Sequence, residues 1–518
     1  MKPGLFLLFF FYTDRWIRLN AEGIVLRLVL AGVVAFNLSA VGLRAGEFQD
    51  DLKARRGRLM ERLGPEALFV AWSAPVRVYS RDVDYEYRQD SNFYYLAGIE
   101  QEDSILVLMP GNLSRKGFLF LKEKDPVREH WQGRMLGKAE ATAASGIETV
   151  YLAAEFEPFM NLVLAGRSYG LPRYSPSREF DAFSKAITAA KARLALILDP
   201  KPGLSGPIEQ PLAFANRAKE RFIGLTVQDA TPLVESLRQV KTPYEQKILE
   251  RSLEISNEAH RAGMRAARPG AYEYEVQAAI EYVYKLRGAE GWGYPSIVGS
   301  GPNATILHYH RGNRKMEAGD LLLVDAAASY GYLTGDITRT YPVSGSYTPA
   351  QKDLYRIVLE AQDEGMKVAK AGAKLTDIHA RTVEVIKAGL LKLGLITDAS
   401  GDQFRTWYTH GASHYIGMDV HDVGSNERPL EPGMAFVIEP GIYIREGALE
   451  FLPKTPENAA FIEKVRPAYQ KYRSIGVRIE DSFLLTESGL KRLSASVPRT
   501  IEEIEKFMQS RPSTAAVR

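Results

Sequence analysis

Leu321-Leu322-Leu323-Val324-Asp325 is the stretch that decides the fold, because four aliphatic residues lead directly into a carboxylate. A short apolar run of this kind predicts a buried strand, which puts Asp325 at a strand end. The pattern returns at Met434 to Ile438, where Glu439 follows at once and Pro440-Gly441 ends the run. We therefore expect the C-terminal half to carry acidic side chains at the ends of buried strands.

Asp336, His414 and Glu480 join these two residues as metal-binding candidates, since each also lies in an apolar stretch or a glycine turn. Near Glu480, the two-residue period of a strand puts Arg478 on the same face. Burying one carboxylate without a partner is costly, and burying several close together is worse. Either each carboxylate has a cationic neighbour, or a multivalent cation lies among them.

Oxygen ligands with one imidazole suit Mn, Co, Fe or Zn at a two-metal site, with ions roughly 3.5–4 Å apart. A single acidic residue at a strand end is usually a turn or cap residue. Several such positions in strands that are expected to meet in one domain favour a metal site instead. Six of the eight histidines fall between residues 308 and 421, which points the same way. The residues alone predict a dinuclear metallohydrolase.

Length, net charge and cysteine content limit the classes of protein to which this chain can belong. A chain of 518 residues is too long for one hydrophobic core, so two or three domains are expected. The net charge is +3 and no basic stripe is present, so we expect no binding to nucleic acid. The absence of cysteine excludes disulfides, thiolate nucleophiles and zinc-thiolate sites.

The N-terminal 45 residues have the character of a leader. Residues 4–12 and 23–45 are apolar apart from Arg27 and Arg44, with further basic residues between the two runs. Basic residues ahead of an apolar run that ends in small residues resemble a secretory signal, which predicts export to the periplasm or the exterior. Arg27 interrupts the apolar run and argues against a stable membrane span. A retained anchor and an upstream start site on a cytoplasmic protein stay open as alternatives.

The rest of the chain divides by its periodicity. Alternating strand-like and helical stretches over 46–232 predict an α/β domain that begins with a helix from Glu47 to Leu63. Long helices then come in two pairs: Pro243 to Arg268 with Tyr274 to Leu286, and Gln351 to Ala371 with Leu375 to Leu393.

Strands that bear the candidate ligands follow each helix pair. Residues 233–508 are therefore expected to form a pseudo-symmetric curved sheet backed by helices, with the metals on its concave face and 509–518 as a flexible tail. Residues 445–475 are polar and contain proline, and we expect a surface loop there, near the mouth of the site.

Taken together, several motifs resemble the aminopeptidase P branch of the pita-bread metallopeptidases, family M24B. The motifs of the C-terminal half are Leu307-His308-Tyr309, Asp325 with Asp336 eleven residues on, His410-Gly-Ala-Ser-His414-Tyr-Ile-Gly, Asp419-Val-His421-Asp-Val-Gly, Ile438-Glu439-Pro-Gly and Val477-Arg478-Ile479-Glu480-Asp481. Upstream, the segments Tyr87 to Gly98 and Glu129 to Arg134 resemble pieces of that family's N-terminal domain. The resemblance extends over nearly the whole chain from about residue 48.

The resemblance implies a creatinase-like α/β domain followed by a pita-bread catalytic domain. It also implies two divalent ions, of which Mn²⁺ is favoured while Co²⁺ and Zn²⁺ suit the same ligands. Asp336 and Glu480 would bridge the two ions, Asp325 would complete one shell, and His414 with Glu439 would complete the other. A hydroxide held between the ions would attack the scissile carbonyl, with Glu439 carrying the proton to the departing nitrogen.

Four more side chains receive roles from the resemblance. His308 and His421 would hydrogen-bond the substrate carbonyl and the tetrahedral intermediate, and His410 would line the proline pocket. Arg478 would pair with a ligand carboxylate or the substrate. Simpler interpretations stay open: a core histidine for His308, a structural cap for His421, and orientation of the His414 loop for His410. His379 lies in a helical pattern and is expected to be structural. Tyr443 either packs in the core or touches the substrate, and His310 has no assignment.

The implied function is release of the N-terminal residue from peptides with proline in second position. Prolidase, which cleaves Xaa-Pro dipeptides with the same metals and fold, is the near alternative, while methionine aminopeptidase lacks the N-terminal domain. A non-catalytic binding module on this scaffold is the alternative of a different class. Peptides are the expected partners, and the family resemblance implies a homodimer or homotetramer.

Overall fold

The computed structural model describes residues 46–171, 178–198 and 208–510. The predicted leader over 1–45 and most of the predicted tail lie outside the described residues. Within the described part, no helix is both long and apolar enough to cross a membrane. The chain divides after Asp50, and the architecture below is that of the unit that begins at Asp51.

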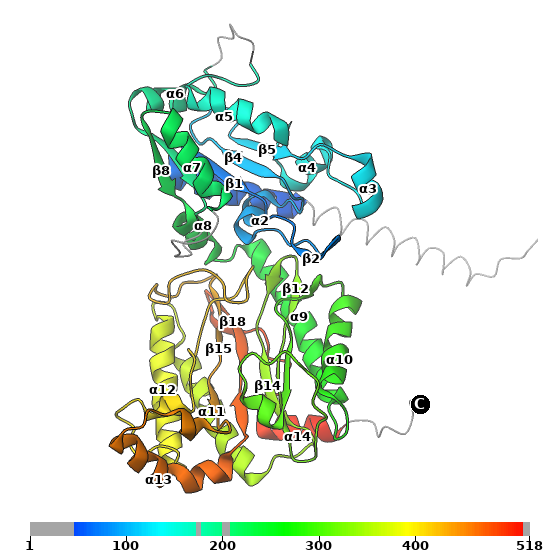
Figure 1. The fold of residues 1–518 in the computed structure, drawn as a ribbon, viewed down its shortest axis with the longest axis vertical. Helices are drawn as coiled ribbons and strands as arrows, with labels where there is room; N and C mark the ends of the chain where they lie inside the picture. The colour runs from blue at the N-terminus through cyan, green and yellow to red at the C-terminus, as the bar shows by residue number, and fades with distance from the viewer. Residues whose placement is uncertain (1–45, 172–177, 199–207, 511–518) are drawn as a thin grey trace, which may run out of the picture. The chain divides into compact units, whose positions relative to one another are not determined.

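The N-terminal part of this unit is a mixed sheet with the strand order β6-β5-β4-β1-β7-β8 (Figure 1). Its strands are β1 (Ala67–Trp72), β4 (Ile105–Leu108), β5 (Gly117–Leu121), β6 (Thr149–Leu152), β7 (Ala192–Leu196) and β8 (Leu225–Asp229). The β1–β7, β7–β8 and β5–β6 pairs are parallel, and β4 is antiparallel to both of its neighbours. Parallel pairs need helical crossovers, so the α/β prediction for this part is confirmed.

Helices and short segments cover and connect this sheet. They are the helix that ends at residue 63, β2 (Val78–Ser80), β3 (Val83–Asp84), α2 (Ser91–Ala97), α3 (Pro126–Gln132), α4 (Lys138–Ser145), η1 (Ala153–Glu155), α5 (Phe156–Leu164), α6 (Asp181–Thr188), α7 (Gln210–Arg221) and α8 (Thr231–Arg238). Apolar side chains of α5, α6 and α7 pack with those of the strands in one core.

The conspicuous motif Tyr87 to Gly98 folds as a capped short helix. Asp90 is the N-cap of α2, where its side chain accepts a hydrogen bond from the backbone N–H of Phe93. Gly98 ends the helix in the left-handed region at φ 64°, a conformation that favours glycine. The motif thus contains its own start and stop signals.

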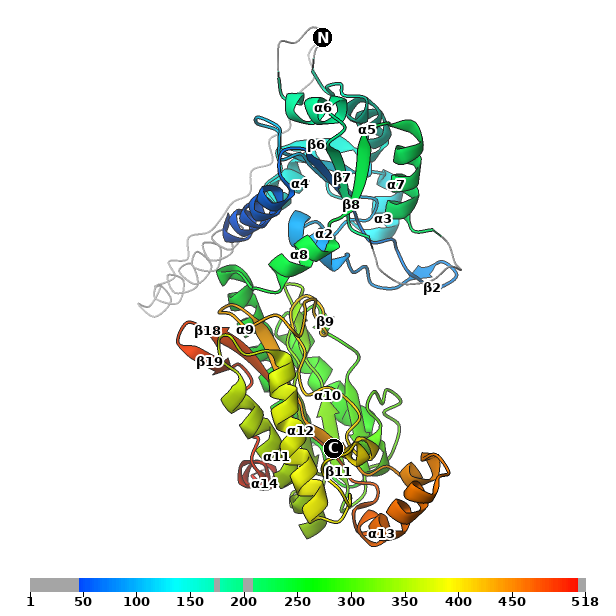
Figure 2. The same cartoon turned by 90° about the vertical axis from the view of Figure 1, so that its left-hand side faces the viewer.

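Two helix pairs form the outer layer of the C-terminal part, as the periodicity predicted. They are α9 (Pro243–Ala266) with α10 (Glu273–Leu286), and α11 (Pro349–Val368) with α12 (Leu375–Lys392) (Figures 1 and 2). Both α9 and α11 begin with a threonine capping box followed by proline, which fixes their starts. A single core joins apolar residues of both pairs to the strands.

Short strands carry the functional residues of this part. They are β9 (Gly291–Trp292), β10 (Ile297–Ser300), β11 (Leu321–Asp325), β12 (Ala328–Tyr330), β13 (Leu333–Thr334), β14 (Thr338–Pro342), β15 (Ala435–Ile438), β16 (Gly441–Tyr443), β17 (Gly476–Arg478), β18 (Asp481–Thr486) and β19 (Gly489–Arg492), with η2 (Gly301–Thr305), η3 (Gln403–Thr406) and the C-terminal α14 (Ile501–Gln509). They form the groups β10-β11-β14, β13-β12-β9, β15-β18-β19 and β16-β17. An isolated antiparallel bridge between Thr338 and Glu480 links strands that follow the first helix pair to strands that follow the second.

The expectation of a surface loop over 445–475 was wrong. This segment forms η4 (Ala448–Phe451) and the 17-residue helix α13 (Pro456–Tyr472). Thr455 caps α13 by accepting a hydrogen bond from the backbone N–H of Asn458, and Phe461 and Val465 are buried one turn apart. Pro467 lies inside the helix and made the sequence look incompatible with one.

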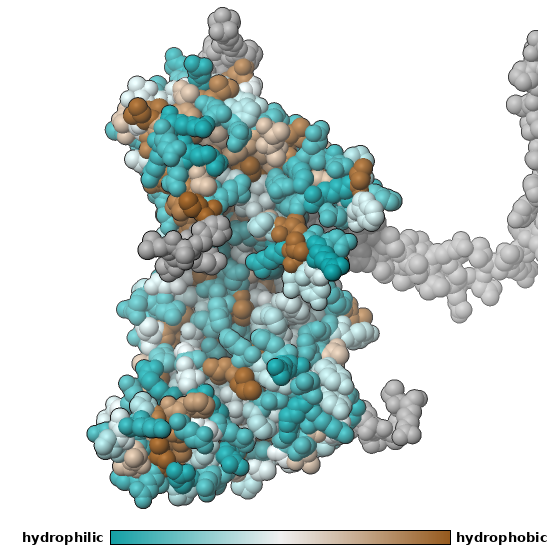
Figure 3. Space-filling model, in the orientation of Figure 1, coloured by the Kyte–Doolittle hydropathy of each residue, from teal (hydrophilic) through white to brown (hydrophobic). Residues whose placement is uncertain are grey.

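Exposed apolar side chains are few and separate on one face of the molecule. On the face drawn in Figure 3, hydrophobic residues form small separate groups among hydrophilic ones. Trp131 on α3 is the most exposed tryptophan among the described residues, at 80%. This side chain therefore does not pack in a core of its own chain.

Arg339 on β14 connects the β10-β11-β14 group to the segment around Glu480 and Asp481. Its side chain is fully buried, and it pairs with Asp481 at 2.6 Å. It also donates to the carbonyl oxygens of Thr338 at 3.0 Å, Glu480 at 2.6 Å and Pro498 at 2.9 Å. A buried guanidinium is stable only when its donors are matched in this way.

We expect Arg339→Met to lower the free energy of unfolding by about 3–5 kcal/mol, because Asp481 would stay buried without its main cationic partner. Urea unfolding followed by circular dichroism measures the change. Arg287→Met, which breaks a surface pair with Glu258, is the matched control and should change stability far less. Equal effects of the two substitutions would contradict this account of Arg339.

Candidate metal centre

Each predicted metal ligand lies at the end of a strand or beside one. Asp325 is the last residue of β11, paired in register with Ile297 and Thr338. Asp336 precedes β14, and its backbone N–H donates to Ser482 Oγ at 2.9 Å. The strand ends therefore hold the first two carboxylates by backbone pairing.

The segments that follow the second helix pair bring the other three candidates. Glu439 follows β15 directly, and its N–H donates to the carbonyl oxygen of Ala412 at 2.8 Å. The carbonyl oxygen of His414 accepts from the N–H of Val437 at 2.9 Å. Glu480 lies between β17 and β18, at the bridge to the first strand group.

The five side chains converge in space. His414 Nε2 lies 3.6 Å from Asp336, 3.6 Å from Glu439 and 3.8 Å from Glu480. Asp325, Asp336 and Glu480 form one set of potential ligand atoms within 4.8 Å of one another, and His414, Glu439 and Glu480 form another. Because Glu480 belongs to both sets, the geometry fits two adjacent cations that share a carboxylate.

The electrostatics of the cluster also fit cations. Burial and the charges of Glu480 and Asp325 raise the pKa of Asp336 well above its usual range. Burial and the charge of Glu480 raise the pKa of Glu439 to about 8. Glu480 Oε1 is buried and has no hydrogen-bond partner among the described residues. A divalent ion would stabilise the ionised forms of Asp336 and Glu439 and give the Glu480 oxygen a partner.

Arg478 supplies one positive charge beside the cluster. Its guanidinium donates to Asp325 at 2.5 Å, to the Tyr443 hydroxyl at 3.0 Å and to Thr338 Oγ1 at 3.0 Å. Burial acts to raise the pKa of Asp325, but the Arg478 charge lowers it below the usual range. Arg478 thus balances Asp325. The other three carboxylates surround His414: burial acts to lower the pKa of this histidine, but Glu480 and Glu439 raise it to about 9.

His410 lies beside Glu439, at the edge of the carboxylate cluster. Its Nε2 is 2.8 Å from the Tyr443 hydroxyl, its Nδ1 is 2.7 Å from the carbonyl oxygen of Gly411, and Glu439 lies 3.7 Å away. Burial and the Arg478 charge lower the pKa of His410 to about 3, so the ring is neutral near pH 7. Tyr443 links this histidine to Arg478, which gives the tyrosine a polar role beyond core packing.

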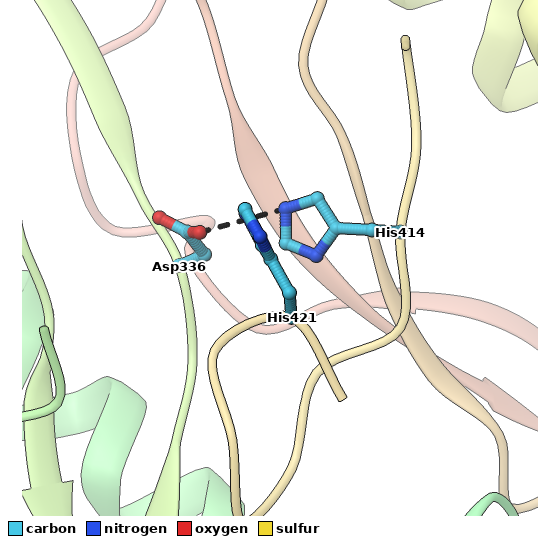
Figure 4. A group of neighbouring side chains, drawn as sticks. All are labelled: Asp336, His414 and His421. Carbon is cyan, nitrogen blue, oxygen red and sulfur yellow. Dashed lines mark ion pairs between the residues drawn. The ribbon is translucent and has the colours of Figure 1, made fainter. Parts of the chain in front are cut away.

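His421 and His308 lie at exposed positions, unlike the ligands. The ring of His421 packs edge-on against that of His414, with centroids 4.3 Å apart, and Figure 4 draws it beside His414 and Asp336. Burial and the charges of His414 and His308 lower the pKa of His421. The core alternative for His308 is wrong, since its side chain is exposed. His421 Nδ1 or Nε2 is also close enough to Asp336 and His414 to join them around a cation.

His379 has the structural role that its helix position suggested. It lies on α12, and its Nδ1 accepts a hydrogen bond from the backbone N–H of Ala412 at 3.1 Å. Ala412 belongs to the segment between His410 and His414. His379 therefore supports the loop through a hydrogen bond to its backbone.

Comparison with known proteins now gives the family. Residues 247–487 match the profile of metallopeptidase family M24, and residues 52–171 match that of the aminopeptidase P N-terminal domain. The Xaa-Pro aminopeptidase of Escherichia coli is 32% identical over 470 residues, 89% of this chain and 98% of the relative. This chain belongs to the aminopeptidase P family of M24 metallopeptidases.

Solved structures agree with this membership in aminopeptidase P. The Pseudomonas aeruginosa aminopeptidase PepP is 31% identical, with a TM-score of 0.73, over 89% of this chain and 98% of that one. Zinc-substituted Escherichia coli aminopeptidase P in complex with product gives the same values. The family resemblance and the fold class predicted from the motifs are confirmed, and the chain is a metal-dependent aminopeptidase.

Sequence reasoning missed Tyr294, whose hydroxyl contacts two of the candidate ligands. Its hydroxyl donates to Asp325 at 2.6 Å and also contacts Asp336. Burial and the charge of Asp325 raise the pKa of Tyr294 well above its usual range, so the hydroxyl keeps its proton.

We expect Tyr294→Phe to weaken metal binding about 10- to 100-fold, because the hydroxyl orients two ligand carboxylates. Competition with a fluorescent chelator measures the affinity. Tyr284→Phe is the matched control: its hydroxyl is also buried but has no hydrogen-bond partner among the described residues. If both variants bind metal as the wild type does, Tyr294 does not orient the ligands.

Proposed function

We propose that this protein removes the N-terminal residue from peptides whose second residue is proline, using two bound divalent ions. The observation that carries the proposal is the convergence of all five candidate ligands with His410, His421 and Arg478 in one site. Relatives named Xaa-Pro aminopeptidase, which this chain matches over nearly its whole length, support the substrate class. A binding module without catalysis would not need this set of side chains together.

The residues of the chain have distinct tasks in this proposal. When bound, the two ions would lower the pKa of a water molecule and polarise the scissile carbonyl. Asp325, Asp336, His414, Glu439 and Glu480 would hold them. His421 and His308 would donate hydrogen bonds to the carbonyl oxygen as charge develops on it, an effect worth roughly 10²–10³ in rate for one such donor.

A proline leaving group sets a particular demand. Its nitrogen belongs to a tertiary amide and has no N–H, so the site cannot bind it through a hydrogen bond from that nitrogen. The site must also supply a proton to the nitrogen as the bond breaks. Glu439 Oε2 lies 3.7 Å from His410 Nδ1, at the side of the site where His410 would meet the proline ring. We infer that Glu439 delivers the proton to this nitrogen.

A groove beside the site has room for the rest of a peptide. A cavity of about 420 Å³ is lined by Leu307, Trp407, Thr409, Tyr443 and Arg445 among others. Leu307 and Thr409 are the neighbours of His308 and His410, and Tyr443 contacts both His410 and Arg478. We propose that residues after the proline occupy this groove, which favours an aminopeptidase over a dipeptidase.

Three further proposals come from the leader and the resemblance. Mn²⁺ is the proposed ion, with Co²⁺ or Zn²⁺ as chemical alternatives. A homodimer or homotetramer is the proposed assembly. Export through residues 1–45 is the proposed localisation, and that segment lies outside the described residues.

We expect the purified protein, stripped of metal and reloaded with Mn²⁺, to cleave an Xaa-Pro-Xaa tripeptide and to release its first residue. The matching Xaa-Ala-Xaa tripeptide is the control for proline, and the Xaa-Pro dipeptide is the control for length. Product release is followed by liquid chromatography. Turnover of the dipeptide alone would make the protein a prolidase, and turnover of neither with metal bound would overturn the proposed substrate class.

A further inference from the structure

The loop that carries His421 is held by ion pairs rather than by regular structure. Residues 417–422, the His421 loop, belong to no helix or strand. Asp422, next to His421, has a side chain that is only 1% exposed. Its carboxylate accepts hydrogen bonds from Arg238 at 2.6 Å and from Lys241 at 2.9 Å. The position of His421 thus depends on two cations that lie far away in the sequence.

Arg238 is the centre of this arrangement. It is the last residue of α8, and its side chain is 2% exposed. One terminal nitrogen donates to Asp422 at 2.6 Å and to Asp419 at 2.7 Å, and the other donates to Asn92 at 2.7 Å. The guanidinium therefore joins the His421 loop to α2 of the N-terminal domain.

The motif at the start of α2 makes two more contacts with the same loop. Ser91 Oγ donates to Asp419 at 3.0 Å, and Arg88 donates to the carbonyl oxygen of Met418 at 2.7 Å. Arg88, Ser91 and Asn92 belong to the segment that the sequence analysis singled out and to which no task had been given. Arg88 and Ser91 hydrogen-bond the His421 loop directly, and Asn92 is connected to it through Arg238.

We propose that Arg88, Ser91 and Asn92 are positioning residues for His421, so that the N-terminal domain sets the geometry of a donor in the active site. The inference rests on the proposed function, in which His421 hydrogen-bonds the reacting carbonyl. A donor must be placed to within fractions of an ångström to act on a transition state, and an irregular loop does not provide that precision by itself.

The charges of four side chains explain why the His421 loop is held in one position. Two cations, Arg238 and Lys241, face two carboxylates, Asp419 and Asp422, so the cluster is balanced. Three of these four side chains are nearly inaccessible, with exposed fractions of 1–2%, whereas Asp419 is 45% exposed. Buried pairs lose much when one partner moves, because a charge is then left without compensation. The His421 loop is therefore expected to have one arrangement as long as Arg238 keeps its partners.

Simple attachment between domains is the competing explanation, and it makes a different prediction. An attachment contact would affect stability and would affect rate equally whether or not His421 is present. A positioning contact acts through His421, so its effect on kcat should vanish when the imidazole is removed.

The test is a double-mutant cycle in the full-length, metal-loaded protein. Asn92→Ala removes the acceptor for Arg238, Asn92→Asp restores an acceptor oxygen, and each is made with and without His421→Ala. Tyr332→Phe is the matched control, because it removes a hydroxyl that accepts a hydrogen bond from the Gln89 N–H at 3.1 Å while the ring stays under the Arg88 guanidinium. Tyr332 keeps its stacking on Tyr94 in that variant.

We expect Asn92→Ala to lower kcat on the Xaa-Pro-Xaa tripeptide about tenfold with little change in KM. The loss should be recovered in Asn92→Asp and absent in the His421→Ala background. Hydrogen–deuterium exchange should increase in residues 417–422 for Asn92→Ala alone, and Tyr332→Phe should match the wild type in both measurements.

An equal loss of kcat in both backgrounds would overturn the inference, as would unchanged exchange of the His421 loop in Asn92→Ala. Inactivity of the wild type toward the tripeptide would instead count against the proposed function. In that event the exchange measurement still decides whether the N-terminal domain holds the loop. The two failures are thus distinguishable.

Discussion

Four carboxylates in one buried cluster are the constraint on which the rest of this structure depends. Asp325, Asp336, Glu439 and Glu480 lie close together, and burial with the neighbouring carboxylate charges raises the pKa of Asp336 and of Glu439. Arg478 offsets one of them, and His414 contacts three of the others. The fold can keep this arrangement because the carboxylates lie at or next to the ends of buried strands. The cluster also has the ligand types and spacing that divalent cations need.

The two halves of the catalytic part meet at this cluster. Asp325 and Asp336 come from strands that follow the first helix pair, whereas Glu439 and Glu480 come from strands that follow the second. The bridge between Thr338 and Glu480 and the fully buried Arg339 hold the halves in register. A pseudo-symmetric domain thus produces a shared site, since each half contributes ligands that are incomplete without the other.

The sequence revealed what depends on local pattern and concealed what depends on tertiary contact. Apolar runs that end in acidic residues located Asp325 and Glu439, and helical periodicity located α9 and α11 within a few residues. Tyr294 gave no such signal, because its importance comes from two carboxylates that reach it only after folding. The helix α13 was missed because Pro467 outweighed Thr455 and the spacing of Phe461 and Val465. The contact of α2 with the His421 loop was likewise not readable from either segment alone.

The central claim is that the carboxylate cluster holds two cations that share Glu480. The most direct measurement is the number of ions bound per chain, obtained by inductively coupled plasma mass spectrometry after loading with Mn²⁺ and removal of free metal. The account predicts two ions for the wild type and at most one for Glu480→Gln. A single ion in the wild type, or two ions retained by Glu480→Gln, would contradict it.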